Sequence, residues 1–216
     1  MGGWEIYLMP ILFQGIMKYD QVDKSYFIIN PHNSRNVYLF PDMPHCGKNF
    51  RSHVLDYGII VPSRDGFKTL DKEDFIDLLR YDKGEIKLCP KLTSLHVNCY
   101  GSMRQRVRLA TQLLSNTVSK AIIHLDGDDA EFKSQYVSTF DAYFDTMNSN
   151  REYADKPLRC GFGKHEEEQI KALEDMKDLV TKMRFCDAPK KETKKPFQKG
   201  ILISINSTLS LWKECM

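Results

Sequence analysis

The sequence predicts an α+β fold, and three observations support that class. Runs of β-branched and aromatic residues, typical of strands, occur in the first quarter of the chain and again near its end. Between them, apolar residues recur every three or four positions over three long segments, as in amphipathic helices. Clusters of glycine, proline and aspartate separate the two kinds of segment. No internal repeat is visible, which argues against a repeat architecture.

The first quarter of the chain is expected to form short strands followed by a helix. Apolar and aromatic runs at 6–13 and 26–29 favour two strands, and 36–40 is a stronger candidate. Apolar residues at helical spacing then predict a short helix that stops near Gly58. Asp42 therefore lies just past the carboxyl end of a strand and before a helix, where ligands and metals gather in α/β sheets.

The middle of the chain is expected to be mostly helical. A strand-like patch at 59–61 precedes a short helix that Thr69 or Asp71 can cap. The spacing of the apolar residues then predicts three longer helices, at 102–123, 131–148 and 165–183.

The end of the chain combines a basic segment with a short apolar one. Residues 187–199 are rich in lysine and interrupted by two prolines, which predicts a linker or a surface arm. The β-branched run 201–205 favours a strand or a buried entry segment, and a last helix is expected near 208–215.

Length and composition exclude several classes of protein. The chain has 216 residues and a mass of 25.1 kDa, with 42% hydrophobic and 28% charged residues, which is ordinary globular composition. A net charge of +2 excludes a uniformly basic surface, so any contact with nucleic acid must come from local basic patches. No apolar run reaches the roughly 18 residues that a membrane helix needs. A secretory leader is not expected either.

The six cysteines are scattered and contain no Cys-x-x-Cys pair. A chain of this length does not need disulfides for stability, so we expect free thiols in a reducing compartment. The histidines do not fall at zinc-ligand spacing with them, which argues against a structural zinc site.

Asp42 has two interpretations. A carboxylate at a strand end can bind Mg²⁺ through its oxygens, but two-metal phosphoryl transfer needs further carboxylates that converge on the same place. Asp followed by Met-Pro is also a good helix start. The residues alone favour the helix cap.

The phosphate-binding candidates are weak. The chain contains neither G-x-x-x-x-G-K-[ST] nor G-x-G-x-x-G after a strand, and the glycines at 161–164 follow no predicted strand. Arg104, Arg106 and Arg108 lie at a predicted helix start and could meet phosphate, although the residues alone favour a solvated helix face.

Two further groups leave alternatives open. Asp145 and Asn148 are one helical step apart and could read a base edge, with Phe144 available for stacking. The alternative is a polar helix end with Phe144 in the core. The lysine cluster within 190–199 could contact nucleic acid or belong to a solvated linker. No Ser-His-Asp or Cys-His arrangement follows from the spacing.

Several stretches, taken in order, resemble P-element-type transposases, the family that includes the THAP-domain transposase relatives. The stretch 37–45, with the letters VYLFPDMPH, resembles the family segment that carries an acidic catalytic residue, and Lys48 is kept after it. The stretch 91–115 resembles the start of the GTP-binding insertion domain, and FDTMNS at 144–149 resembles its Phe-Asp-Asn helix. PFQKGILISI at 196–205 resembles the return toward the nuclease fold. The resemblance covers about residues 26–212.

This resemblance implies an RNase H-like nuclease domain interrupted by a mostly helical insertion. The insertion of such proteins binds GTP without a P-loop, and the nucleotide positions the DNA. The expected division is a partial RNase H-like domain at 1–60, a helical GTP-binding insertion domain at 61–196, and a return segment at 197–216.

The resemblance also assigns expected roles to residues. Asp145 would accept hydrogen bonds from the guanine edge, while Lys91 and Arg106 would meet phosphates. Asp42 would be one member of the catalytic acidic triad and a ligand of Mg²⁺. The complete set expected at the nucleotide is Lys91, Arg106, Val107, Ser115, Phe144, Asp145 and Asn148.

The chain departs from the family pattern in the remaining carboxylates. No match to the first acidic residue occurs within 1–25. The third acidic residue, a glutamate, is expected after the return segment, and the sequence ends at Met216 before that position. No zinc-coordinating DNA-binding module is visible either. We therefore expect a transposase-derived GTP-binding module that is catalytically incomplete.

Two alternatives to that expectation remain. One is an active nuclease subunit that borrows carboxylates from a partner chain for Mg²⁺-dependent strand cleavage and transfer. The other is an interaction scaffold that has lost nucleotide binding. The family context implies a nuclear protein, DNA as a partner and no membrane, and it leaves a homo-oligomer open.

Overall fold

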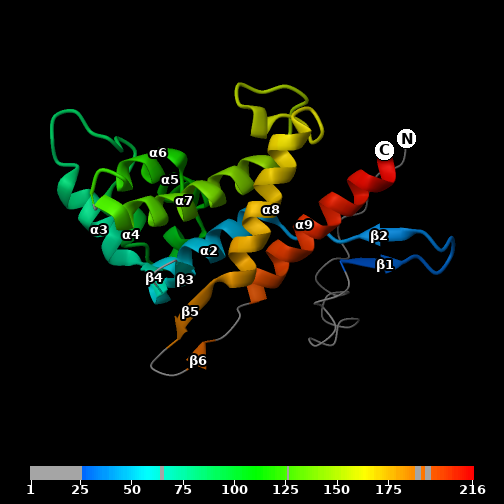
Figure 1. The fold of residues 1–216 in the computed structure, drawn as a ribbon, viewed down its shortest axis with the longest axis horizontal. Coiled ribbons are helices and arrows are strands. Elements are labelled where there is room, and N and C mark those ends of the chain that lie inside the picture. Colours follow the sequence, from blue (N-terminus) through cyan, green and yellow to red (C-terminus); the bar gives the residue numbers. More distant parts are fainter. Residues whose placement is uncertain (1–25, 64–65, 126, 188–190, 193–195) are drawn as a thin grey trace.

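The computed structural model describes residues 26–63, 66–125, 127–187, 191–192 and 196–216 (Figure 1). It is an α+β fold, as predicted, in which a large helical body carries two small antiparallel sheets. The strand expected at 6–13 lies outside the described residues.

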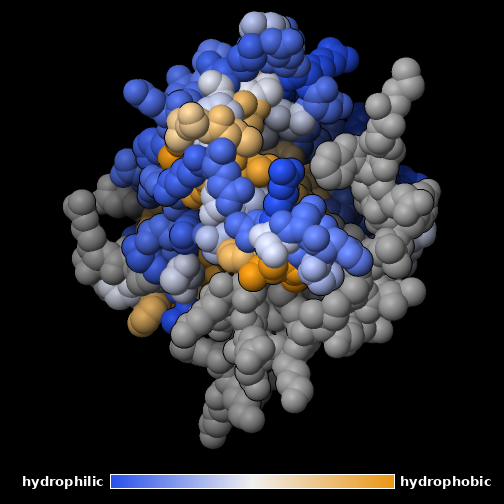
Figure 2. Space-filling view, turned by 90° about the vertical axis from the view of Figure 1, so that its right-hand side faces the viewer, coloured by the Kyte–Doolittle hydropathy of each residue, from blue (hydrophilic) through white to orange (hydrophobic). Residues whose placement is uncertain are grey.

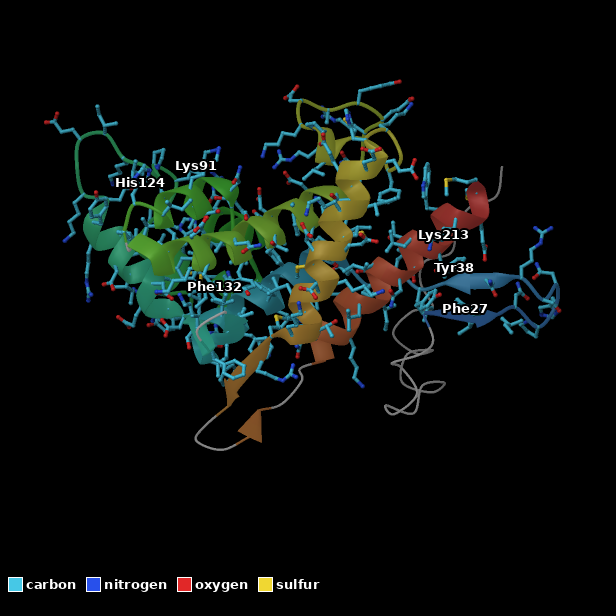
Figure 3. All side chains as sticks on the ribbon, in the orientation of Figure 1. Phe27, Tyr38, Lys91, His124, Phe132 and Lys213 are labelled. Carbon is cyan, nitrogen blue, oxygen red and sulfur yellow. The ribbon has the colours of Figure 1, made fainter. Side chains whose placement is uncertain are left out.

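A β-hairpin stands at one end of the molecule beside the last helix (Figure 1). Strands β1 (Phe27–Ile29) and β2 (Asn36–Tyr38) pair antiparallel, with Ile28 opposite Val37. Figure 3 labels Phe27 and Tyr38 on this hairpin and Lys213 near the adjacent end of helix α9 (Pro196–Cys215). The described surface at this end is mainly hydrophilic, with a small group of hydrophobic residues (Figure 2).

Polar contacts fasten the hairpin to helix α9. Ser207 Oγ lies 3.0 Å from the carbonyl oxygen of Tyr26 and 2.7 Å from that of Leu39. Glu214 accepts hydrogen bonds from the Tyr38 hydroxyl and, at 3.0 Å, from the Asn36 amide. The Ser207 hydroxyl thus meets backbone carbonyl oxygens that flank the two strands, and the Glu214 carboxylate meets side-chain donors of β2.

The second sheet lies under the helical body and has the strand order β4-β3-β5-β6. Ile59 of β3 (Ile59–Ser63) pairs with Leu70 of β4 (Gly66–Leu70) on one side and with Phe185 of β5 (Arg184–Asp187) on the other. These three side chains are buried, so the sheet contributes one face to the core. Strand β6 is Lys191–Glu192.

The helices share one continuous hydrophobic core with that sheet. The Phe50 ring of α2 stacks on Phe140 of α7 at 4.5 Å between centroids, and Phe197 of α9 approaches Phe50 edge-on at 6.0 Å. The buried Tyr143 hydroxyl lies 2.8 Å from Ser204 Oγ, which satisfies both polar groups inside the core. The longer helices of the body are α2 (Met43–Tyr57), α3 (Lys72–Tyr81), α7 (Gly127–Met147) and α8 (Glu166–Lys182).

The predicted single helix at 102–123 is wrong, because the chain breaks twice in this range. It forms the short 3₁₀ helix η2 (Gly101–Gln105), then α5 (Val107–Leu113), then α6 (Asn116–Ile122). Ser115 caps α6, with its hydroxyl oxygen accepting from the Val118 N–H at 3.4 Å. Capping residues such as serine stabilise a new helix start, so they favour a break where one fits the packing. The very short helix α4 (Ser94–Val97) precedes this region.

The strand alternative for 201–205 is also wrong, because these residues lie inside α9. Phe197, Ile201 and Ile205 recur every four residues and are all buried against the core. This burial outweighs the strand preference of the isoleucines.

Four other predicted helices are confirmed within a few residues, whereas the last helix, expected near 208–215, already begins at Pro196. The helix that ends near Gly58 is α2, and those at 131–148 and 165–183 correspond to α7 and α8. Asp71 caps α3 with a full capping box, whereas Thr69 lies in β4.

The remaining expectations concern thiols, membranes and the basic segment. The five cysteines whose side chains the structure describes are free thiols. Among the described residues, no helix is both long and apolar enough to span a membrane. Part of the segment 187–199 lies outside the described residues, and 196–199 form the first turn of α9.

Candidate functional site

A cavity of about 1040 Å³ lies between the start of α6, the last turns of α7 and the loop that leads to α8. Five of the seven residues expected at a nucleotide line it, although they come from three separate parts of the chain. They are Lys91, Ser115, Phe144, Asp145 and Asn148. The structure therefore brings together residues that the sequence keeps far apart.

Arg106 and Val107 do not belong to this lining. Arg106 is the exposed residue that precedes α5, and Val107 is half-buried against the core. A role for either residue at a nucleotide stays a prediction.

Asp145 is the most buried charged group of the cavity, with 8% of its surface exposed. Its Oδ1 lies 2.9 Å from an Arg159 guanidinium nitrogen, and its Oδ2 lies 3.5 Å from Lys156 Nζ. The hydrogen bond to the carboxylate raises the pKa of Arg159 above its ordinary value. Two cations thus compensate for the burial of one carboxylate.

Phe144 occupies the core position that the sequence left as one of two alternatives. Its ring lies 6.1 Å from that of Phe140, and Gly47 packs closely against its edge. The side chain is 9% exposed, and that remaining surface faces the cavity. Phe144 therefore supports the cavity wall from the core side.

Asp141 also lines the cavity, and the sequence analysis missed it. It lies one helical turn before Asp145 and accepts a hydrogen bond from the Asn116 backbone at the start of α6. Burial, assisted by the nearby negative charge of Asp145, raises the pKa of Asp141 to about 6. Its spacing of four residues from Asp145 was the signal available in the sequence.

The raised pKa of Asp141 predicts a pH dependence of stability. Between about pH 4 and about pH 6 the folded chain holds the proton more tightly than the unfolded chain, so this group favours folding less as pH rises through that window. Asp141→Asn should therefore be more stable than wild type at pH 7, with the difference shrinking toward pH 4. Urea unfolding at several pH values measures it. A constant difference, or none, would contradict the assignment, and the exposed Asp175→Asn serves as the control.

Exposed cations complete the rim of the cavity. Lys91, labelled in Figure 3, lies on one wall, and Arg151, Lys156 and Arg159 lie on the opposite loop. Tyr153 in that loop is 70% exposed and has Lys164 Nζ 4.7 Å from its ring centre. The lining thus pairs a recessed carboxylate with an accessible positive rim.

The loop that carries Arg159 is anchored on α8. The buried Gln169 donates to the Cys160 carbonyl oxygen at 3.0 Å and accepts from the Gly163 N–H at 2.8 Å. Gly163 has φ +92 and packs against the ring of Trp212. The glycines at 161–164 therefore serve the packing of this loop, and among the described residues they form no phosphate cradle.

The arginines expected at a helix start have different surroundings in the structure. Arg104 forms an ion pair with Asp56, whereas Arg108 is exposed, as a solvated helix face predicts. The fully buried Arg51 donates to the Arg104 carbonyl oxygen at 2.7 Å and so ties α2 to η2.

Asp42 caps helix α2. Its carboxylate accepts from the His45 N–H at 3.0 Å, as the helix-cap interpretation predicts. No group of three or more metal-ligating side chains occurs among the described residues. A single capping carboxylate does not fit a two-metal centre, so we derive no catalytic step at this residue.

Comparisons with known proteins match this chain to a family of domains and to relatives of known name. Residues 45–159, just over half of the chain, match the family described as TNP-like, GTP-binding insertion domain. The chain is 27% identical over 198 residues to the Transposable element P transposase of Drosophila melanogaster, covering 88% of this chain and 25% of that protein. It is also similar to a chain of the Drosophila P element transposase strand transfer complex, with a TM-score of 0.75 and 26% identity over 88% of this chain and 43% of that one.

The matched range includes the cavity lining from α6, α7 and the loop up to Arg159. It begins earlier and ends earlier than the range 61–196 expected for the insertion, and that division stays a prediction. The chain spans about a quarter of the length of its curated relative. On the match to more than half of its residues, the chain belongs to the TNP-like GTP-binding insertion domain family.

Proposed function

We propose that this chain binds GTP in the cavity between α6, α7 and the loop before α8, as a module derived from a P-element-type transposase. One observation carries the proposal. Five residues that the family resemblance assigns to the nucleotide share one cavity within the range that matches the GTP-binding family.

The chemistry of the cavity favours a guanine base. The Watson–Crick edge of guanine presents two neighbouring N–H donors, and the Asp145 carboxylate presents two acceptors from a recess. Adenine offers an acceptor where guanine has its N1–H, so it would leave the buried carboxylate poorly satisfied. The exposed rim cations, including Lys91 and Arg151, suit the triphosphate.

The role of this chain in DNA cleavage is also part of the proposal. Asp42 would be one catalytic carboxylate and a Mg²⁺ ligand only where other carboxylates join it, so we propose that the chain alone does not cleave DNA. In a longer protein or an oligomer, DNA would be the partner and the nucleus the compartment. The solved relative is named as a strand transfer complex, which supports DNA as the partner.

Titration of the purified chain with GTP, ATP and XTP tests the proposal. We expect GTP to bind at least about tenfold more tightly than ATP, because a paired base-edge contact contributes about 1–3 kcal/mol of discrimination. A folded sample that binds no nucleotide would overturn the proposal in favour of an interaction scaffold. Mg²⁺-dependent DNA cleavage that is lost in Asp42→Ala would instead show an active nuclease subunit.

A further inference from the structure

We propose that Arg159 determines base specificity together with Asp145, by donating a hydrogen bond to the purine O6 while Asp145 accepts from N1 and N2. This inference rests on the proposed function, because it concerns the same cavity and the same guanine ligand. It adds a residue that the sequence analysis did not consider.

The position of the guanidinium carries the inference. An Arg159 nitrogen lies 2.9 Å from Asp145 Oδ1, so a donor already stands beside the acceptor that would read the base. A guanidinium carries five N–H donors, and this ion pair engages one of them in the structure. The Arg159 side chain is 52% exposed, and the residue lines the cavity. Its remaining donors are therefore accessible to a ligand.

The Arg159–Asp145 pair matches guanine in the order of its hydrogen-bond donors and acceptors as well as in charge. Along its Watson–Crick edge, guanine presents the O6 acceptor, the N1 donor and the N2 donor. A cation beside a carboxylate presents donor, acceptor and acceptor in the matching order. Adenine has an amino group in place of O6 and a lone pair at N1, so it would meet both partners with the wrong polarity. Two mismatches reject adenine more strongly than one.

The donor is also held in place before any ligand binds. Arg159 ends the 3₁₀ helix η3 (Pro157–Arg159), and its N–H donates to the Lys156 carbonyl oxygen at 3.0 Å. The next residue, Cys160, is buried, and its carbonyl oxygen accepts from the buried Gln169. A donor on an anchored backbone loses less conformational freedom on binding than one on an untethered loop.

Two other side chains near Asp145 could contact the guanine O6 instead of Arg159. Lys156 approaches Asp145 at 3.5 Å through the end of a flexible side chain, and Asn148 is exposed just beyond α7. Arg159 has the shorter contact with the carboxylate and the planar fork that suits side-by-side contacts.

Comparing GTP with 6-thio-GTP tests the assignment, because sulfur is a weak hydrogen-bond acceptor. For the wild-type chain at pH 7 we expect 6-thio-GTP to bind about five- to tenfold more weakly, as befits a hydrogen bond to a charged donor. In Arg159→Met the two nucleotides should bind equally, whatever the overall loss of affinity. Arg159→Lys should recover part of the difference.

The matched controls are Lys156→Met and Asn148→Ala, which should keep the wild-type ratio of GTP to 6-thio-GTP affinity. A purely structural role of Arg159 would weaken both nucleotides and leave that ratio unchanged, which would overturn the inference. A wild-type chain that does not distinguish the two nucleotides would also overturn the inference, and so would a control variant that removes the difference.

A wild-type chain without preference for GTP over ATP would overturn the proposed function as well. Intact GTP preference with an unchanged ratio in Arg159→Met would overturn the Arg159 assignment alone.

Discussion

Asp145→Asn is expected to exchange a preference for GTP for a preference for XTP. The amide presents one acceptor and one donor in place of two acceptors, and xanthine presents N1–H and the C2 carbonyl to match them. The native carboxylate is almost fully buried, so a mispaired base leaves an unsatisfied polar group. We expect the ratio of GTP to XTP affinity to fall by about tenfold to a hundredfold, measured by titration calorimetry.

The control for this exchange is Asp155→Asn. Asp155 lines the same cavity but is exposed, so its substitution removes the same charge without changing the recess. Its ratio of GTP to XTP affinity should equal that of the wild type. If Asp145→Asn kept the wild-type ratio as well, another group would read the base, and the assignment of Asp145 would be wrong.

Gly163→Ala is expected to cause the largest loss of stability among the substitutions considered. A Cβ at this position would lie 2.7 Å from Trp212 Cζ3, which is inside van der Waals contact, and the backbone has φ +92. Strain at a positive φ costs about 1–2 kcal/mol, and overpacking typically costs a further 1–3 kcal/mol. We expect the free energy of unfolding to fall by about 2–5 kcal/mol in urea titrations.

Gly101→Ala separates the two contributions to this loss. Gly101 also has a positive φ, of +51, but a Cβ there would meet nothing within 4 Å. It should lose the backbone part alone, about 1 kcal/mol. Equal losses at Gly101 and Gly163 would show that the Trp212 ring moves aside easily and does not fix the loop.

The sequence predicted the α+β class and several helices because their signals are local. Asp71 caps a short amphipathic helix, and apolar residues along 165–183 recur at helical spacing up to the end of α8. The break before α6 was not predictable in the same way. Apolar periodicity continues across Ser115, and only tertiary packing decides whether a serine caps a new helix or lies inside an old one.

The strand preference of 201–205 was overridden by packing for a related reason. Ile201 and Ile205 are β-branched, but both belong to the buried face that α9 turns toward α2 and α8. Local propensity contributes tenths of a kcal/mol per residue, whereas full burial of such a side chain contributes about 1.5–3 kcal/mol.

The candidate site was predictable only in part. The resemblance named Lys91, Asp145 and Asn148, and the structure places them around one cavity. Arg159 was missed, because a contact between the end of α7 and a distant loop has no local signature. Ion pairs of this kind emerge only when the fold brings two segments together. Asp141 was missed although its spacing of four residues from Asp145 was visible in the sequence.

Helix α9 has a mechanical consequence for the whole molecule. It is one unbroken rod of 20 residues, which corresponds to about 30 Å. Near one end Glu214 accepts hydrogen bonds from the Asn36 and Tyr38 side chains of the hairpin, and near the other end the buried Gln198 donates to the Val180 carbonyl oxygen in α8. An uninterrupted helix keeps its two ends at a constant separation, so α9 sets the distance between the hairpin and the carboxyl end of α8. The amino end of α8 in turn holds the Arg159 loop through Gln169.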